Sequence, residues 1–183
     1  LVIQTSPGIY NQFSLAFKRA LEDKNIKFII TVESDHIYPK NFINEFIHIY
    51  EELNYQVIQA KVSMKKAKNV FEFFHKLYLE LHHIHPVNRY DIGAPALWPI
   101  DLLEKCLNSI NKVKGYGFDT CLSEFLSLNK IKCCYCDLKV FEDVEINFNR
   151  FYKRHLNYGK GDYEFLISNK GNWGFLRIFK SVT

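Results

Sequence analysis

The chain has 183 residues, a length that suits one domain with a continuous hydrophobic core. Its net charge of +4 fits an anionic small-molecule ligand or an anionic membrane surface. The charge is too small for the dense basic face of a dedicated nucleic-acid binder. No apolar run approaches the ~20 residues of a membrane-spanning helix. Composition therefore predicts a single domain that binds no nucleic acid.

The five cysteines indicate a reducing compartment. Their number is odd, and the cluster of Cys133, Cys134 and Cys136 lacks the two-residue gap of a zinc knuckle or a redox motif. Buried reduced thiols therefore fit the pattern better than a metal site does. We expect a cytoplasmic protein, placed at the inner face of the membrane if its basic tail contacts lipid. Because the sequence begins at Leu1 rather than at Met, we also expect a piece of a longer protein.

The first part of the chain has the pattern of a strand, a helix and a second strand. Residues 1–4 are apolar and precede turn residues, 10–22 place apolar residues at helical spacing, and 26–32 are apolar and β-branched. Such a unit is typical of a parallel sheet. We therefore predict an α/β fold with a mostly parallel central sheet flanked by helices.

Two carboxylates, Glu33 and Asp35, follow the second predicted strand directly. Many α/β folds bind their ligands at the carboxyl ends of strands. Side chains at i and i+2 of an extended segment point to the same side, so we expect Ser34 to turn away and both carboxylates to bind one hard cation. The sequence thus predicts a metal site that would hold a diphosphate.

Apolar patterns in the middle of the chain predict a helix from about residue 40, a strand at 55–62 and a helix at 70–81. The His-rich segment 82–85 either closes the 70–81 helix or binds a metal. The first role is favoured, because His near the carboxyl end of a helix interacts well with the helix dipole. In that helix we predict that one apolar face packs in the core: Phe71, Phe74, Leu77, Tyr78 and Leu81.

Small residues and one large aromatic residue mark the segment 93–99. Gly93 would let the backbone approach a ligand closely, and Trp98 could stack on a base or on a sugar face. A tight turn anchored by a half-buried Trp98 explains the pattern equally well. A helix is predicted for 100–110, with Pro99 near its first turn.

Asp119 lies where a glycine loop, 114–117, leads into another predicted helix. It either caps this helix or holds a carboxylate at the rim of a pocket. A strand is predicted for 131–136, continued beyond Asp137. The tail then interleaves aromatic residues with basic residues that include Arg154 and Lys160. These basic residues could bind phosphates, lie on a membrane surface or form a solvated helix face.

Taken in order, these segments resemble the family 2 glycosyltransferases, which have the GT-A fold. The strand ending in Glu33-Ser34-Asp35, followed by Pro39 and a helix, is similar to the acidic DxD motif of that family, with Glu33 in place of the first Asp. Asp119-Thr120-Cys121-Leu122 resembles its ED-t-x-L motif, with Phe118 in place of the Glu.

The resemblance continues over nearly the whole chain. Gly8 and the helix behind it look like the segment before the acidic strand, 93–99 is similar to the acceptor-side loop, and 154–163 resembles a basic YG segment. This implies one GT-A-like, Rossmann-like domain over 1–165 and a carboxy-terminal extension over 166–183. Two further strands precede this region in the family, so we expect the front strands of the domain to be missing.

The resemblance implies a metal-dependent, inverting transferase that moves a sugar from a UDP- or GDP-sugar to a hydroxyl of a glycan, lipid or protein acceptor. Mn²⁺ or Mg²⁺ would be bound by Asp35 first and by Glu33, with His36 or His155 as a third ligand. Asp119 would be the general base. The other implied contacts are Gly8, Ser34, Arg154 and Lys160 for the donor, and Gly93 and Trp98 for the acceptor.

Two other functions compete with this one. A degenerate or incomplete GT-A domain could act as a binding or interaction module without catalysis, at a membrane or on a partner, and the replacements at Glu33 and Phe118 favour it. A nucleotidyltransferase also uses carboxylates and a metal on phosphates, but no glycine-rich phosphate loop lies near the amino end. Preference for a diphosphate, for a triphosphate or for neither would separate the three.

Overall fold

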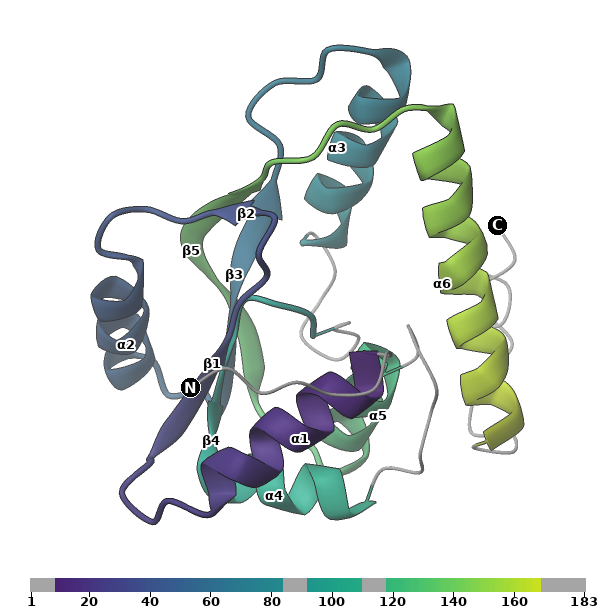
Figure 1. The fold of residues 1–183 in the computed structure, drawn as a ribbon. Coiled ribbons are helices and arrows are strands. Elements are labelled where there is room, and N and C mark those ends of the chain that lie inside the picture. Colours follow the sequence, from purple (N-terminus) through teal and green to yellow (C-terminus); the bar gives the residue numbers. More distant parts are fainter. Residues whose placement is uncertain (1–8, 84–91, 110–117, 169–183) are drawn as a thin grey trace.

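The structure is a computed structural model that describes residues 9–83, 92–109 and 118–168 (Figure 1). It confirms the expected α/β class, because these residues form one five-stranded sheet and six helices. The predicted strand at 1–4, Gly8 and the glycine loop at 114–117 lie outside the described residues. The elements in chain order are α1 Ile9–Leu21, β1 Phe28–Thr31, β2 His36–Ile37, α2 Phe42–Glu52, β3 Val57–Ser63, α3 Val70–His82, β4 Ala96–Pro99, α4 Ile100–Ser109, α5 Phe118–Leu128, β5 Cys133–Glu142 and α6 Phe148–Ser168.

The strand order of the sheet is β1-β4-β3-β5-β2. Only the β3–β5 pair is parallel, and the other neighbouring pairs are antiparallel. The prediction of a mostly parallel sheet is therefore wrong for the described residues. β4 lies between β1 and β3 and runs against both. The sequence predicted a loop or tight turn for residues 93–99, so a strand at 96–99 corrects that expectation. Its pairing with β1 and β3 depends on segments distant in sequence.

The register brings three distant segments to one edge of the sheet. Thr31 at the end of β1 pairs with Ala96 at the start of β4, and Ala96 also pairs with Gln59 of β3. The hydroxyl of Thr31 accepts a hydrogen bond from the Ala96 backbone N–H at 3.0 Å. The residues just after β1 and those just before β4 therefore lie at the same edge of the sheet. Glu33 belongs to the first segment and Gly93 to the second.

Helices cover both faces of the sheet, with α2 on one side and α1, α4 and α5 on the other (Figure 1). Successive side chains of β3 point to opposite faces of the sheet, as in any strand. Val57 therefore packs on the side of α1, α4 and α5, and Ile58 packs on the α2 side. On the α2 side, Phe42 and Phe46 pack on Leu97 and Val140. On the other side the fully buried residues include Trp98, Leu103, Cys106 and Leu122.

All five cysteines are free thiols, and only Cys134 is not fully buried. Burial raises the pKa of Cys133 to about 12 and that of Cys134 to about 11, with each neighbouring thiol adding to the shift. The prediction of buried thiols is confirmed. β5 continues through Asp137 with a bulge, because Ala60 pairs with Cys136 while Lys61 pairs with Lys139.

The apolar face predicted for α3 points outward, which corrects the core prediction. Phe74, Leu77, Tyr78 and Leu81 are all exposed, and only Phe71 of that set is partly buried, against rings of α6. The buried side of α3 instead carries Glu72 and His75. Glu72 is satisfied there by the backbone N–H groups of Lys68 at 2.6 Å and Ile146 at 3.3 Å. Polar partners therefore decide which side of this helix faces inward.

The basic tail forms the long helix α6, which contacts α3 and α5. The boundary predicted after residue 165 falls inside this helix, because α6 continues to Ser168. Its exposed side chains include Phe148, Tyr152 and Tyr163. Contact of this helix with a membrane surface stays a prediction. None of the described helices is long and apolar enough to cross a bilayer.

Phe46 and Phe74 provide a matched test of which helix faces are buried. Phe46 is fully buried, whereas Phe74 is 52% exposed. We expect Phe46→Ala to lower the free energy of unfolding by about 3–5 kcal/mol through the cavity it leaves. Phe74→Ala should change it by less than about 1 kcal/mol. Urea denaturation followed by circular dichroism measures both, and equal losses would contradict the outward orientation of α3.

Candidate functional site

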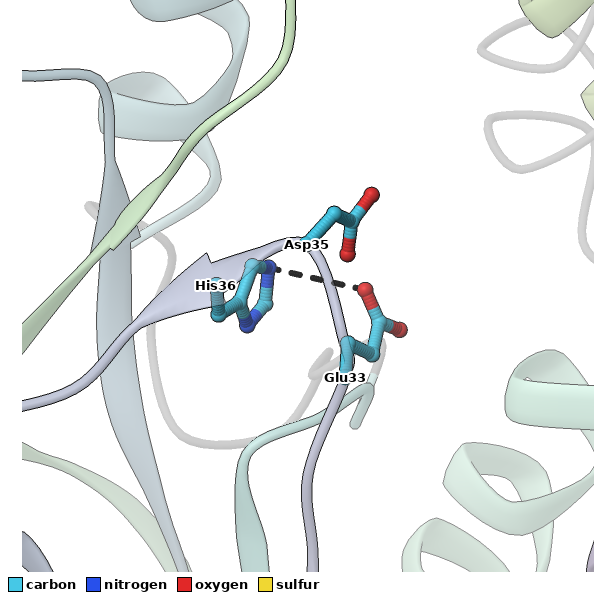
Figure 2. Close-up of side chains that lie close together, drawn as sticks. All are labelled: Glu33, Asp35 and His36. Carbon is cyan, nitrogen blue, oxygen red and sulfur yellow. Dashed lines mark ion pairs between the residues drawn. The ribbon is translucent and has the colours of Figure 1, made fainter.

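The acidic segment after β1 is a tight turn. The backbone N–H of His36 donates to the Glu33 carbonyl at 3.4 Å, and Ser34 lies exposed at the tip of the turn. The expectation of an extended segment is therefore wrong, although both carboxylates still lie together. The turn brings ligand atoms of Glu33, Asp35 and His36 within 4.8 Å of one another (Figure 2).

Tyr38 holds this turn in place. Its hydroxyl accepts a hydrogen bond from the Glu33 backbone N–H at 2.8 Å and donates to the Glu33 carbonyl at 3.1 Å. The same hydroxyl lies 3.3 Å from Nδ1 of His36. The Tyr38 ring is anchored in turn by an edge-on contact with Phe42 of α2. The geometry of the turn is thus tied to the hydrophobic core.

These contacts favour one tautomer of His36. Because the Tyr38 hydroxyl donates its proton to a hydrogen bond with the Glu33 carbonyl, its oxygen can accept a hydrogen bond from Nδ1–H of His36. Nε2 then keeps a lone pair and lies 3.5 Å from the Glu33 carboxylate. Burial lowers the pKa of His36, against the opposing effect of Asp35 and Glu142. A neutral imidazole with Nε2 available is the form that binds metals.

Glu33 lies in an environment that disfavours its charge. About half of its side chain is exposed, yet desolvation by the surrounding atoms is the largest cause that raises its pKa. The charges of Asp35 and Glu142 add to the shift, while Arg154 opposes it. The pKa of Glu33 reaches about 7. Burial and the neighbouring carboxylates thus both disfavour the ionised form of Glu33, and a bound cation would favour it.

A buried ion pair lies next to the turn. Arg154 of α6 donates through Nη1 to Glu142 at 2.6 Å, and His75 of α3 bonds to the other Glu142 oxygen at 2.6 Å. β2 pairs with β5 so that His36 lies opposite Glu142. The Asp143 backbone N–H also donates to the Asp35 carbonyl at 2.7 Å. The end of β5 thus connects the acidic turn to α3 and α6.

Arg154 lies where its charge acts on the acidic turn, and its contact with a phosphate stays a prediction. Burial by itself would lower the pKa of Arg154, but Tyr158, Glu142 and Asp35 raise it above its usual value. Its side chain is 20% exposed, so the guanidinium keeps some access to solvent. Lys160 is exposed, and six helical residues place it ~120° around α6 from Arg154. The two basic residues therefore do not share a face.

Asp119 and Gly93 lie close together, although they are distant in sequence. A Cβ atom on Gly93 would lie 4.0 Å from Oδ2 of Asp119 and 3.9 Å from Nε2 of Gln59. Asp119 belongs to the first turn of α5, which begins at Phe118, so it lies inside the helix rather than at its cap. Its backbone carbonyl accepts a hydrogen bond from the Ser123 hydroxyl at 2.9 Å.

The structure does not support a ligand-stacking role for Trp98. The residue belongs to β4, is only 1% exposed and packs in the core, so its ring has no open face for a sugar. Both sequence interpretations, a stacking ring and a turn anchor, differ from this placement. His155 is also absent from the metal-ligand cluster, because its ring packs on Phe151 and Tyr158 within α6.

Glu142, His75, Gln59 and Tyr38 took no part in the site predicted from sequence. His75 did carry a signal, because Glu72 and His75 are polar residues three apart in the aromatic first half of α3 and therefore share a face. Glu142 carried no such signal, because it ends β5 and its partner Arg154 lies twelve residues further along the chain. His83, from the His-rich segment, caps α3 and accepts a hydrogen bond from the Val62 backbone N–H at 3.2 Å.

Comparison with known proteins does not assign the chain to a family. No protein-family model matches the sequence, and no curated protein is significantly similar to it.

The ion pair predicts a particular dependence of stability on pH. Burial alone would raise the pKa of Glu142, but the hydrogen bond with His75 and the charge of Arg154 lower it from 4.5 to about 2. The pair therefore stabilises the fold fully above pH 4.5, and this contribution is lost as the pH falls towards 2. We expect Glu142→Gln to destabilise the protein at pH 7 by on the order of 3 kcal/mol, with a smaller difference at low pH.

Thermal unfolding followed across pH 2–7 measures this effect, within the window set by the pKa of Glu142. Glu145→Gln is the control, because Glu145 is exposed on the segment between β5 and α6. A difference between wild type and Glu142→Gln that does not change with pH would contradict the ion pair.

Proposed function

We propose that this chain belongs to a glycosyltransferase that moves a sugar from a nucleotide-diphosphate donor to an acceptor hydroxyl. The observation that carries the proposal is the shared edge of the sheet. The Glu33–His36 turn follows β1, and Gly93, which precedes the neighbouring strand β4, lies against Asp119. Groups suited to a diphosphate and a group suited to an acceptor proton thus lie at the same edge.

The residues of the turn fit a hard divalent cation. Carboxylate oxygens are the ligands that Mg²⁺ and Mn²⁺ prefer, and Asp35 and Glu33 supply them beside Nε2 of His36. The raised pKa of Glu33 fits this function, because a bound cation would favour its ionised form. Such a cation would neutralise charge that builds on the leaving diphosphate.

The protein's own residues would perform the remaining steps. Arg154, held by Glu142 and close enough to Asp35 to be affected by its charge, would contact a phosphate oxygen. Asp119 would take the proton of the acceptor hydroxyl while that oxygen attacks the anomeric carbon. The bond between that carbon and the diphosphate oxygen breaks at the same time. Attack opposite to the leaving group would invert the anomeric centre.

Metal-dependent nucleotide binding tests the first half of this proposal. We expect calorimetry to detect UDP or GDP binding in the presence of Mn²⁺ and much weaker binding with EDTA. Asp35→Asn should weaken the metal-dependent binding by more than about tenfold, since it removes a ligand oxygen. Asp137→Asn is the control, because Asp137 is exposed and paired with Lys61 at 2.5 Å. Absence of binding by wild type would favour an interaction module, and preference for UTP or GTP would favour a nucleotidyltransferase.

Asp119→Asn tests the second half. The amide cannot take a proton, so release of nucleotide diphosphate from a panel of UDP- and GDP-sugars should fall by about 10²- to 10⁴-fold. Binding of UDP or GDP with Mn²⁺ should stay unchanged. Asp101→Asn is the matched control, since Asp101 is an exposed Asp in the first turn of α4. Loss of both turnover and nucleotide binding would contradict the assignment of Asp119 as the base.

A further inference from the structure

The carboxamide of Gln59 is buried in the sheet, and its oxygen lacks a partner. Gln59 is 6% exposed, and its Oε1 has no hydrogen-bond partner among the described residues. Leaving a buried polar atom unpaired costs folding free energy, and most such atoms in folded proteins are paired. A methionine would fill the same space without this cost. A ligand hydroxyl would supply the partner that this oxygen lacks among the described residues.

The side chain of Gln59 points toward Gly93 and Asp119. A Cβ atom added to Gly93 would lie 3.9 Å from Nε2 of Gln59 and 4.0 Å from Oδ2 of Asp119. Both distances are ordinary van der Waals contacts. The Gly93 loop is held against the sheet, because the Pro95 carbonyl accepts a hydrogen bond from the Ala60 N–H at 3.0 Å. A ligand atom above Gly93 would therefore contact both polar side chains.

We propose that Gln59, Gly93 and Asp119 form a subsite for two neighbouring hydroxyl groups of a sugar ring. One hydroxyl donates to the Asp119 carboxylate. The adjacent hydroxyl bonds to the Gln59 carboxamide, which offers a donor and an acceptor that exchange places when the amide rotates. Gly93 leaves room for the ring edge between them. Assigning this diol to the acceptor rests on the proposed function, because that function makes Asp119 the base.

Two variants separate binding at this subsite from folding. Gln59→Met keeps the side-chain length but removes both amide atoms, so the melting temperature of the ligand-free protein should stay the same or rise. Gly93→Ala adds a methyl group at ordinary contact distances, so the fold should persist while the subsite is filled. Gln56→Met is the matched control, because Gln56 is exposed just before β3.

The probes are methyl glucopyranoside and methyl mannopyranoside, each with its monodeoxy analogues. Their binding is followed by ligand-observed NMR, with and without UDP and Mn²⁺. For the wild type we expect one of the two glycosides to bind, and removal of either neighbouring hydroxyl to weaken binding. Gln59→Met should weaken binding of the parent glycoside about three- to tenfold, the effect of one hydrogen bond. Gly93→Ala should abolish it, and Gln56→Met should leave it unchanged.

The nucleotide measurement keeps the two proposals apart. All three variants should bind UDP with Mn²⁺ as the wild type does. If the wild type binds nucleotide but neither glycoside, or if Gln59→Met binds the glycoside as tightly as the wild type, the subsite is wrong and the proposed function stands. If a glycoside binds with this dependence on Gln59 while no nucleotide binds, the subsite stands and the proposed function fails.

Discussion

The buried carboxylate of Glu142 is the group on which the arrangement of the site depends. A carboxylate that is almost fully enclosed must be paired, because the free energy of removing it from water is large. Its partners come from α3 and α6, so both helices are held at the end of β5 by His75 and Arg154. The same residue lies opposite His36 in the sheet. One buried charge thus links the position of Arg154 to that of the acidic turn.

The electrostatic balance around this pair explains the character of the turn. Burial is the largest cause of the raised pKa of Glu33, the charges of Asp35 and Glu142 add to it, and Arg154 opposes it. Glu142 keeps a low pKa because its hydrogen bonds and the charge of Arg154 outweigh its burial, whereas Tyr38 bonds only to the backbone N–H and carbonyl of Glu33. A proton at Glu33 removes part of the negative charge at the turn, and the proposed divalent ion would offset it in the same way.

Polar contacts also explain why a strongly apolar helix is turned outward. The sequence of α3 is apolar over more than one face, so periodicity indicates a helix but leaves its rotation open. The rotation is decided by Glu72 and His75, whose partners are the Ile146 backbone and Glu142. If the aromatic side were buried instead, Glu72 and His75 would lose these contacts. In the observed orientation several large apolar side chains of α3 are exposed. In this orientation the Glu72 carboxylate and Nε2 of His75 are paired, whereas Nδ1 of His75 has no partner among the described residues.

The sequence by itself indicated the helices, the strands β1, β3 and β5, the acidic pair after β1, and Gly93 and Asp119 as candidate site residues, because these depend on local spacing and residue chemistry. It did not predict the strands β2 and β4. Strand direction, the turn at Ser34, the buried place of Trp98 and the contribution of Gln59 were decided only by the tertiary structure. Each depends on pairing between segments far apart, as when Ala96 meets both Thr31 and Gln59. Local patterns report which side chains can be buried, whereas long-range register decides which of them meet.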